Sequence, residues 1–513
     1  MFSSPLLLGA VAIEGYVVLA VELLAIRQLT PYVGNATDTV AIVIAAVLLP
    51  LALGYEAGGR MRFAPSAPGR ADGMSAEAEG RSARAKRRFD GRSDASPDHA
   101  KPSAIQPVGD GSPRHGDEAG VRRRLTRNLL LAAFVLSFGL SHPYLVAFFQ
   151  VLDGIGVTHR LVQTALHTSL FLSYPVYLLG QTVPLVAHCS TGASLPRSTG
   201  LMLFFSTFGS FLGSVVSTLV LMTFWGVHIT VAFTLGLLVL LAGLIGRRTR
   251  RRGELLLAAG GLGLYICAVN APAVMRAYGI VGDTLYSQVR VLTDPAENSR
   301  LLVINNSPSS KVADEPGHRL AYVEFIEREI LGKLDPSRPH RILVIGAGGF
   351  TIGLDDRVNA YTYVDIDPTL REVSEAHFLR RPLGANKAFV PESARAFLRR
   401  AGGTYDVVVL DAFTNRLNLP PDLITREAFA AVRRAVAPGG QAVMNVVASP
   451  GFADRFSRSI DATIRGVFPF VSRQVLHQTQ VGGVASVLYL AGGHGDEPHD
   501  IYTDDRNRSF LDH

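Results

Sequence analysis

Four acidic residues in the second half of the chain follow short apolar runs, at positions where a parallel sheet would present side chains to a ligand. Asp365 and Asp367 come after one run, Glu392 after the next and Asp411 after a third. Ligands of open parallel sheets bind at the carboxyl ends of the strands, so we expect these carboxylates to share one edge of a sheet. The pattern predicts a ligand site at that edge.

A glycine-rich turn upstream of these acids indicates the class of ligand. A buried strand predicted at 342–345 leads into Gly346-Ala347-Gly348-Gly349, and Asp365 follows downstream. Nucleotide-binding folds place the carboxylate that binds ribose hydroxyls about twenty residues after such a turn, as here. Thr351 replaces the third glycine of the dinucleotide pattern, which favours an S-adenosyl ligand over NAD. The alternative is a turn that only packs a helix on the sheet.

Alternating strands and helices around this turn predict a doubly wound α/β domain of the Rossmann-like type. We expect it to cover residues 336–495, behind a small β-sheet and a lead-in helix at 276–335, and before a tail at 496–513. The predicted elements are strands at 286–292, 300–305, 342–345, 361–364, 388–390, 406–410, 441–447 and 485–490, and helices at 318–331, 369–377, 393–401, 425–435 and 454–467.

The first half of the chain has the composition of a membrane domain. Of the 513 residues, 48% are hydrophobic and only 18% are charged, a balance that is unusual for a soluble protein. Seven apolar runs each approach the ~20 residues that cross a bilayer. They predict a multi-span α-helical domain in the cell (inner) membrane, with two helices in residues 1–58 and five in 128–275. The runs cover 5–25, 40–55, 128–150, 161–186, 199–225, 227–245 and 254–274.

Two basic segments lie between these apolar runs, and the formal charge of +7 is better explained by them than by nucleic-acid binding. Residues 59–127 lack hydrophobic periodicity and predict a disordered loop, and Arg247 to Arg252 form a second basic block. The positive-inside rule predicts that both are cytoplasmic. If the seventh run spans the membrane, the C-terminal domain lies outside the cytoplasm. If that run is re-entrant, the domain lies inside, and the sequence leaves this open.

Glu14 and Glu22 lie within the first apolar run. Carboxylates inside a membrane are costly and usually face a partner or a polar cavity. One interpretation is a path for a cation or a polyamine. The other, which we favour, is pairing with polar groups such as His167, Gln181 or Arg27.

The segment VVVLDAFTNRLNLPPDLITREAF, together with Asp365 and Glu392 upstream, resembles the spermidine synthases, which are polyamine aminopropyltransferases. The resemblance is strongest to the branch in which this domain is fused behind several membrane spans. The segment EGYVVLAVELLAIRQLTPYVGN and the tail IYTDDRNRSFLDH are also similar to that branch. The resemblance extends over the chain except for residues 59–127.

This resemblance implies transfer of an aminopropyl group from decarboxylated S-adenosylmethionine to a diamine such as putrescine, with release of methylthioadenosine and no metal ion. It implies that Asp365 binds the ribose hydroxyls, that Glu392 lies near the adenine and that Asp411 is the general base for the amine. Tyr322 would line the amine site.

The glycines and one glutamine complete the expected donor site. Gly346 and Gly348 would let the nucleoside approach the backbone, and Gln288 would correspond to the glutamine of the family's Tyr-Gln pair. Here Ser287 stands between Tyr286 and Gln288, which puts that correspondence one position out of register.

Two acids of the family pattern are absent. Phe350 and Thr351 follow the glycines where the family carries an aspartate, and the loop after Asp411 lacks its second acid; Asp422 or Glu427 could substitute. Two alternatives therefore stay open, an S-adenosylmethionine-dependent methyltransferase and a catalytically degenerate polyamine-binding or transport protein.

The expected partners are a small amine, a nucleoside donor and the lipid bilayer, without nucleic acid. The number of subunits is open, a homodimer included.

Overall fold

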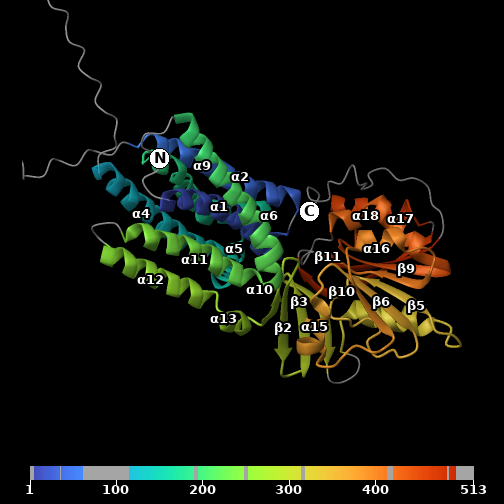
Figure 1. Cartoon of the computed structure of the whole chain (residues 1–513). Helices are drawn as coiled ribbons and strands as arrows, with labels where there is room; N and C mark the ends of the chain where they lie inside the picture. Colours follow the sequence, from blue (N-terminus) through green and yellow to red (C-terminus); the bar gives the residue numbers. More distant parts are fainter. Residues whose placement is uncertain are drawn as a thin grey trace, which may run out of the picture.

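The computed structural model describes residues 5–34, 36–61, 115–189, 195–247, 252–313, 318–412, 420–468, 470–481 and 484–492. An N-terminal helical domain and a C-terminal α/β domain lie end to end in an elongated molecule (Figure 1). The two domains meet at the small β-sheet that follows the last helix of the first domain.

The N-terminal domain is a bundle of long helices, some of which are interrupted by short π-helical turns. Its elements are α1 (Pro5–Val33), α2 (Thr37–Gly59), α4 (His115–Leu140), α5 (His142–Gly154), α6 (Arg160–Thr168), η1 (Ser169–Ser173), α7 (Tyr174–Gly180), α8 (Thr182–Ala187), α9 (Leu195–Val215), η2 (Val216–Met222), α10 (Thr223–Trp225), α11 (Val227–Gly246), α12 (Arg252–Val269) and α13 (Pro272–Ala277).

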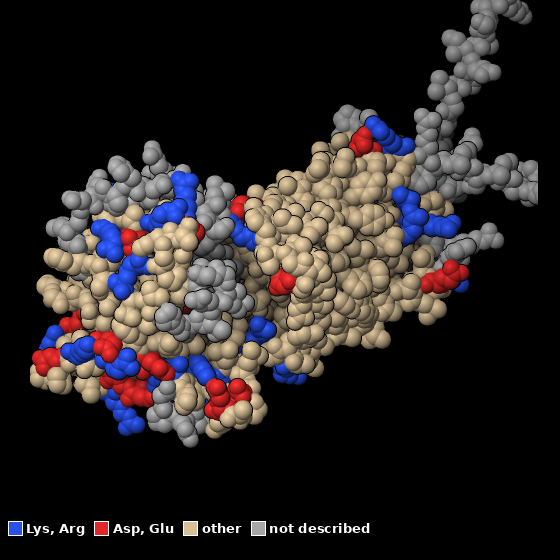
Figure 2. Space-filling model, turned by 180° about the vertical axis from the view of Figure 1, so that it is seen from behind, with Lys and Arg blue, Asp and Glu red and all other residues tan. Residues whose placement is uncertain are grey.

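Six helical stretches in the described part of the chain are long and apolar enough to cross a membrane. The pair α4 and α5, bent by 62°, makes a seventh if it is counted as one span. The described part of every predicted apolar run lies in one of these helices. Large apolar side chains face outward, as Leu257 and Leu264 do at 79% and 74% exposure, and few charged side chains interrupt the middle of the bundle surface in Figure 2.

The predicted loop at 59–127 lies mostly outside the described residues, but its last part is helical. Helix α4 begins at His115, well before the predicted start of the third span at Asn128. Arg122 on this helix is buried and donates to Glu118 one turn away at 2.9 Å. Such a pair lets charged residues stay in the helix, which is why the helix extends past the apolar run.

Contacts between helices show which helix termini lie at the same end of the bundle. A Cβ on Gly246, at the end of α11, would lie 3.4 Å from the side chain of Thr126 on α4 and 3.5 Å from Leu255 near the start of α12. We call this the basic end, because both basic segments adjoin it. At the opposite end, Asn270 after α12 donates to Ser141 after α4 at 3.0 Å.

The partners that we predicted for the carboxylates of the first span are engaged elsewhere. His167 contacts the carbonyl oxygen of Gly139, Gln181 contacts Asn128, and Arg27 pairs with Asp283. The described contacts of Glu14 are instead the hydroxyls of Tyr55 and Ser206, which donate to it at 3.4 and 3.2 Å. Glu14 therefore pairs with polar groups, as we favoured, but the partners that we named for it were wrong.

The small sheet is antiparallel and has four strands in the order β1-β2-β3-β4. The strands are β1 (Ile280–Asp283), β2 (Gln288–Asp294), β3 (Ser299–Ile304) and β4 (Ser307–Ala313). Only two of them were predicted. Asn305 and Asn306, both at positive φ, form the turn between β3 and β4. Such a pair after an apolar run favours a hairpin turn, but β4 itself, SPSSKVA, is mostly polar and has no strand pattern.

The large sheet has seven strands in the order β10-β11-β9-β8-β5-β6-β7. Strands β5 to β9 are parallel, and β11 is antiparallel to both of its neighbours. The strands are β5 (Arg341–Ile345), β6 (Ala360–Asp365), β7 (Lys387–Pro391), β8 (Tyr405–Leu410), β9 (Val436–Ala448), β10 (Phe470–Val481) and β11 (Val484–Gly492).

Helices cover both faces of this sheet (Figure 1). They are α14 (Ala321–Phe325), η3 (Ile326–Ile330), η4 (Leu331–Lys333), α15 (Leu370–Val373), η5 (Ser374–Leu379), α16 (Ala394–Arg400), η6 (Pro421–Leu423), α17 (Arg426–Ala435) and α18 (Arg455–Arg465). This is the predicted doubly wound, Rossmann-like fold. The sheet is mixed, and not wholly parallel as we predicted, because β11 runs antiparallel to β9 and to β10, a strand that was not predicted. Chain order reverses between β5 and β8, which makes this point the topological switch.

Candidate active site

A cavity of about 880 Å³ lies at the carboxyl ends of β5, β6 and β8, at the topological switch point. The small sheet, α14, the loop before α16, η6, β9, β11 and helix α1 of the helical domain also contribute to its wall. Among the described residues, three acids line it, Asp365, Asp411 and Asp422. Residues 413–419, which include most of the loop after Asp411, lie outside the described residues.

The glycine turn after β5 brings two neighbouring segments close together. Gly346 and Gly348 have φ of +89° and +50° and both line the cavity. A Cβ on Gly346 would lie 2.2 Å from the backbone oxygen of Asp411, and one on Gly348 would lie 2.8 Å from Oγ of Ser309. Glycine is required here because other residues rarely adopt such φ values and their side chains would collide. The turn therefore fixes the approach of Asp411 to β5 and also leaves the backbone accessible to a ligand.

Asp365 lies at the end of β6 and faces the cavity. It accepts hydrogen bonds from the backbone N–H groups of Ala347 at 3.0 Å and Asp367 at 3.1 Å. Burial raises the pKa of Asp365 to about 6, although these backbone donors oppose the shift. Its carboxylate is held by the glycine turn and still has acceptor capacity for hydroxyl groups of a ligand.

Asp411 is the carboxylate whose environment is best suited to proton transfer. Burial raises the pKa of Asp411 to about 7, while hydrogen bonds from Asn445 and Tyr322 act in the opposite direction. Nδ2 of Asn445 donates to Oδ1 of Asp411 at 2.8 Å. A general base works best when its pKa is close to the working pH. Asp411 therefore has the properties of a base near neutral pH.

Asn445 was not among the predicted site residues. It lies on β9, and its Oδ1 accepts a hydrogen bond from the Ser486 hydroxyl on β11 at 2.5 Å. This contact orients the amide, so that its NH₂ group points to Asp411. A polar residue near the carboxyl end of a buried apolar strand is the signal that would have located it.

Tyr322 on α14 lies beside Asp411, as expected for a residue of the same site. Its hydroxyl donates to the carbonyl oxygen of Ser309 at 3.0 Å and also faces the Asp411 carboxylate. Burial raises the pKa of Tyr322 well above its ordinary value, so the hydroxyl remains protonated. The structure thus brings Gly346, Gly348, Tyr322, Asp365 and Asp411 together around one cavity.

Two other predicted residues do not line the cavity. The Glu392 carboxylate pairs with Arg400, Oε1 lying 2.5 Å from the guanidinium, and this pair lowers the pKa of Glu392. Only its backbone adjoins the site, through a 2.8 Å hydrogen bond to Asp365. Nε2 of Gln288 lies 3.4 Å from Nδ1 of His142 in the helical domain. Tyr286 and Ser287 occupy the cavity wall instead.

Of the other acids, Asp367 and Glu427 do not line the cavity, whereas Asp422 does. Asp367 is buried and accepts hydrogen bonds from the hydroxyls of Thr284 and Thr369 at 2.8 and 2.7 Å. Phe350 is fully buried against Tyr363 and is not part of the cavity wall. No group of three or more His, Cys, Asp or Glu within the described ranges is placed to hold a metal ion.

No family model matches the chain. Its sequence is similar to that of a polyamine aminopropyltransferase from Vibrio vulnificus, with 29% identity over 164 residues, 30% of this chain and 52% of the relative. It is also similar to polyamine aminopropyltransferase 2 from Pseudomonas aeruginosa, with 26% identity over 196 residues, 36% of this chain and 54% of the relative. The matches thus span about half the length of each relative.

Solved structures give weaker likenesses. A probable spermidine synthase from Corynebacterium glutamicum matches with a TM-score of 0.35 and 23% identity, over 40% of this chain and 77% of that chain. Spermidine synthase from Thermotoga maritima matches with a TM-score of 0.31 and 18% identity, over 43% and 73%. On the sequence comparisons, the C-terminal part of this chain is similar to the polyamine aminopropyltransferase family.

Proposed function

We propose that this chain is a membrane-anchored aminopropyltransferase, which moves an aminopropyl group from decarboxylated S-adenosylmethionine to an amine and releases methylthioadenosine. The observation that carries the proposal is Asp411, a carboxylate with a pKa of about 7 on the wall of a cavity at the topological switch point. The sequence similarity of the C-terminal part to polyamine aminopropyltransferases supports the same reaction.

In this reaction a C–N bond forms at the methylene next to the sulfonium, the C–S bond breaks and a neutral thioether leaves. The attacking amine must first lose a proton, and Asp411 would accept it. Asn445 and Tyr322 would hold the carboxylate in position. Asp365 would take hydroxyl groups of the ribose, since its carboxylate oxygens can accept further hydrogen bonds beside those from the backbone.

The acceptor that we propose is a diamine such as putrescine. A diamine needs a second carboxylate for its distant ammonium group, and Asp422 is the third acid on the described cavity wall. It lies on η6, well after Asp411 in sequence, and would replace the acid that is absent from the loop after Asp411.

Mass-spectrometric product analysis tests the reaction. The detergent-purified full chain is incubated with decarboxylated S-adenosylmethionine and a panel of amines. Methylthioadenosine should appear with a matching aminopropylated amine, and Asp411→Asn should abolish both. Transfer that survives in Asp411→Asn, or no product from the folded wild type, would overturn the proposal. Methyl transfer from S-adenosylmethionine in the same assay would instead favour the methyltransferase alternative.

We also infer which side of the membrane the C-terminal domain occupies. Both basic segments adjoin one end of the helical bundle, whereas Arg27, His142 and His228 contact the C-terminal domain at the other end. With α4 and α5 counted as one span there are seven crossings, an odd number. If the positive-inside rule places both basic segments in the cytoplasm, the seventh span, which follows the second segment, leads the chain to the opposite side of the membrane, where the C-terminal domain would lie.

Reporter fusions test this orientation. Alkaline phosphatase fused after Val274 should be active, because it would follow the seventh span, and the matched fusion after Gly246 should be inactive. Fluorescent-protein fusions at the same two points should give the reverse pattern. A fluorescent fusion after Val274 would refute the inferred side.

This orientation favours one alternative function. Decarboxylated S-adenosylmethionine is a cytoplasmic metabolite, so a domain outside the cytoplasm would need a supply of donor. A catalytically degenerate domain that binds polyamine for transport would need none. Asp411→Asn separates the two functions, because it should abolish transfer by an enzyme and leave transport by a binding protein largely intact.

A further inference from the structure

The first helix of the helical domain reaches the wall of the cavity. Thr30, one turn before the end of α1, lines the cavity together with residues of the C-terminal domain. Its hydroxyl donates to the carbonyl oxygen of Ile26 at 2.8 Å, so the side chain is fixed on the helix. A helix of the first domain therefore forms part of the proposed active site.

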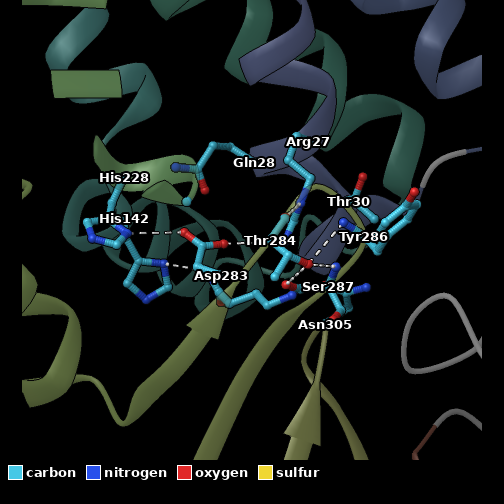
Figure 3. A network of polar contacts seen from close by, with 12 residues as sticks. Arg27, Gln28, Thr30, His142, His228, Asp283, Thr284, Tyr286, Ser287 and Asn305 are labelled. Carbon is cyan, nitrogen blue, oxygen red and sulfur yellow. Dashed lines mark hydrogen bonds and ion pairs between the residues drawn. The ribbon is translucent and has the colours of Figure 1, made fainter. Parts of the chain in front are cut away.

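Arg27, almost one turn before Thr30, holds the nearest segment of the C-terminal domain (Figure 3). Its Nε donates to the carbonyl oxygen of Thr284 at 2.7 Å, and a terminal nitrogen lies 3.3 Å from Oδ1 of Asp283. The side chains of Arg27 and Asp283 are only 6% and 4% exposed. Solvent screens such a pair little, so its loss would leave a buried charge without its partner.

The segment that Arg27 holds is a turn whose side chains line the cavity. In this turn, residues 284–287, the N–H of Thr284 donates to the carbonyl oxygen of Ser287 at 2.9 Å. Leu285, Tyr286 and Ser287 all line the cavity. The position of the turn therefore decides the shape of this wall.

The other side of the turn is tied to the proposed ribose site. The hydroxyls of Thr284 and Ser287 both donate to Oδ2 of Asp367, the first at 2.8 Å. The N–H of Asp367 in turn donates to the Asp365 carboxylate. A continuous set of polar contacts thus runs from Arg27 through the turn to Asp365.

A second element of the helical domain supports the same strand end. Nδ1 of His228 on α11 lies 3.7 Å from Oδ2 of Asp283 (Figure 3). Gly226, at φ +83°, passes so close that a Cβ there would lie 2.8 Å from the backbone oxygen of Asp283. The end of β1 is therefore held by two separate helices of the first domain.

We propose that Arg27 is a positioning residue of the donor site, which sets the place of the 284–287 turn and, through Asp367, that of Asp365. The proposal rests on the proposed function for the identity of the ligand, but not for the coupling itself. It predicts that the helical domain acts on donor binding and that the C-terminal domain is incomplete without it. It does not make Arg27 a catalytic residue, since the side chain is not part of the cavity wall.

The test compares Arg27→Gln and Arg27→Lys with Arg160→Gln in the full chain. Arg160 is the control, because it forms a largely buried pair with Asp38 in the helical domain, 17% and 14% exposed, and does not line the cavity. Hydrogen exchange of peptides covering 280–290 reports the order of the turn without requiring activity. The dissociation constant of methylthioadenosine and the KM and kcat of transfer report the site.

Arg27→Gln should raise exchange in 280–290 and weaken methylthioadenosine binding by about tenfold, the effect of losing a hydrogen bond to a charged group. The KM for the donor should rise more than kcat falls, Arg27→Lys should restore part of the loss, and Arg160→Gln should match the wild type. Unchanged exchange, or an equal effect of Arg160→Gln, would overturn the proposal. If exchange rises but the wild type neither binds the nucleoside nor transfers, the proposed function fails and the coupling stands.

Discussion

Replacing Asp411 by asparagine should stabilise the protein while abolishing transfer, and the gain should depend on pH. Burial raises the pKa of Asp411 from its ordinary value of 3.8 to about 7 in the folded chain. The unfolded chain ionises this carboxyl at lower pH than the folded chain does. Stability that is present below pH 3.8 is therefore lost as the pH rises toward 7. Asparagine cannot ionise and escapes this loss.

The size of the effect follows from the shift. A separation of about three pKa units corresponds to about 4 kcal/mol at pH 8 and to less than about 2 kcal/mol at pH 5, where the folded carboxyl is still protonated. Both values are upper bounds, because the carboxylate faces the cavity and water reduces the penalty. For a domain of this size, 1 kcal/mol shifts Tm by roughly 2–4 °C.

Thermal unfolding in detergent at several pH values provides the assay. The Tm difference between Asp411→Asn and the wild type should grow by several degrees between pH 5 and pH 8. Every other titrating group is common to both proteins, so this trend isolates Asp411. Glu372→Gln, which removes an exposed carboxylate on α15, should show no such trend. A constant Tm difference for Asp411→Asn would refute the assignment of Asp411 as a buried carboxylate that titrates near neutral pH.

Three further predictions concern the same cavity. Asn445→Ala removes a hydrogen bond that stabilises the ionised Asp411 carboxylate. The rising limb of the plot of kcat/KM against pH should therefore shift to higher pH by about one pH unit, and an unshifted limb would contradict this. Gly346→Ala places a Cβ against the backbone of Asp411 at a positive φ and should cost more than about 2 kcal/mol, seen as a lower Tm. Asp422→Asn should raise the KM of a diamine by up to about fivefold, the limit for an exposed pair, and leave that of a monoamine unchanged; equal effects would remove Asp422 from the acceptor site.

The strand-end acids show what local sequence pattern can predict. Asp365 and Asp411 follow short apolar runs, which are typical of buried parallel strands. Their position at the switch point then follows from the order of strands and helices. Glu392 follows such a run too, but Arg400 two turns later on α16 draws its side chain away. The sequence pattern thus predicted the correct edge of the sheet, but it did not predict which of the acidic side chains face the cavity.

Gln288 shows how a single residue alters such a prediction. Successive side chains of a strand point to opposite faces, so the one-residue offset introduced by Ser287 reverses the face on which the glutamine lies. Ser287 consequently meets Asp367, and Gln288 meets His142 in the helical domain. The one-residue offset is visible in the sequence. That Gln288 then contacts the helical domain could be predicted only by knowing that this domain covers the opposite face of the small sheet.

The residues that the helical domain adds to the site cannot be predicted from a local pattern. Arg27 and Asp283 are 256 positions apart, and Arg27 occurs in an apolar helix where a basic residue is typical of a helix end near the membrane surface. Only the packing of α1 against β1 gives it a partner. Because Thr30 and the turn held by Arg27 shape one wall of the cavity, a ligand in the cavity lies against helix α1 as well as the C-terminal domain. The proposed transferase should therefore change its substrate preference with substitutions in α1 as well as in the α/β domain. Thr30→Ala should change the relative kcat/KM values across an amine panel, and Thr39→Ala on α2, also buried but outside the cavity wall, should not.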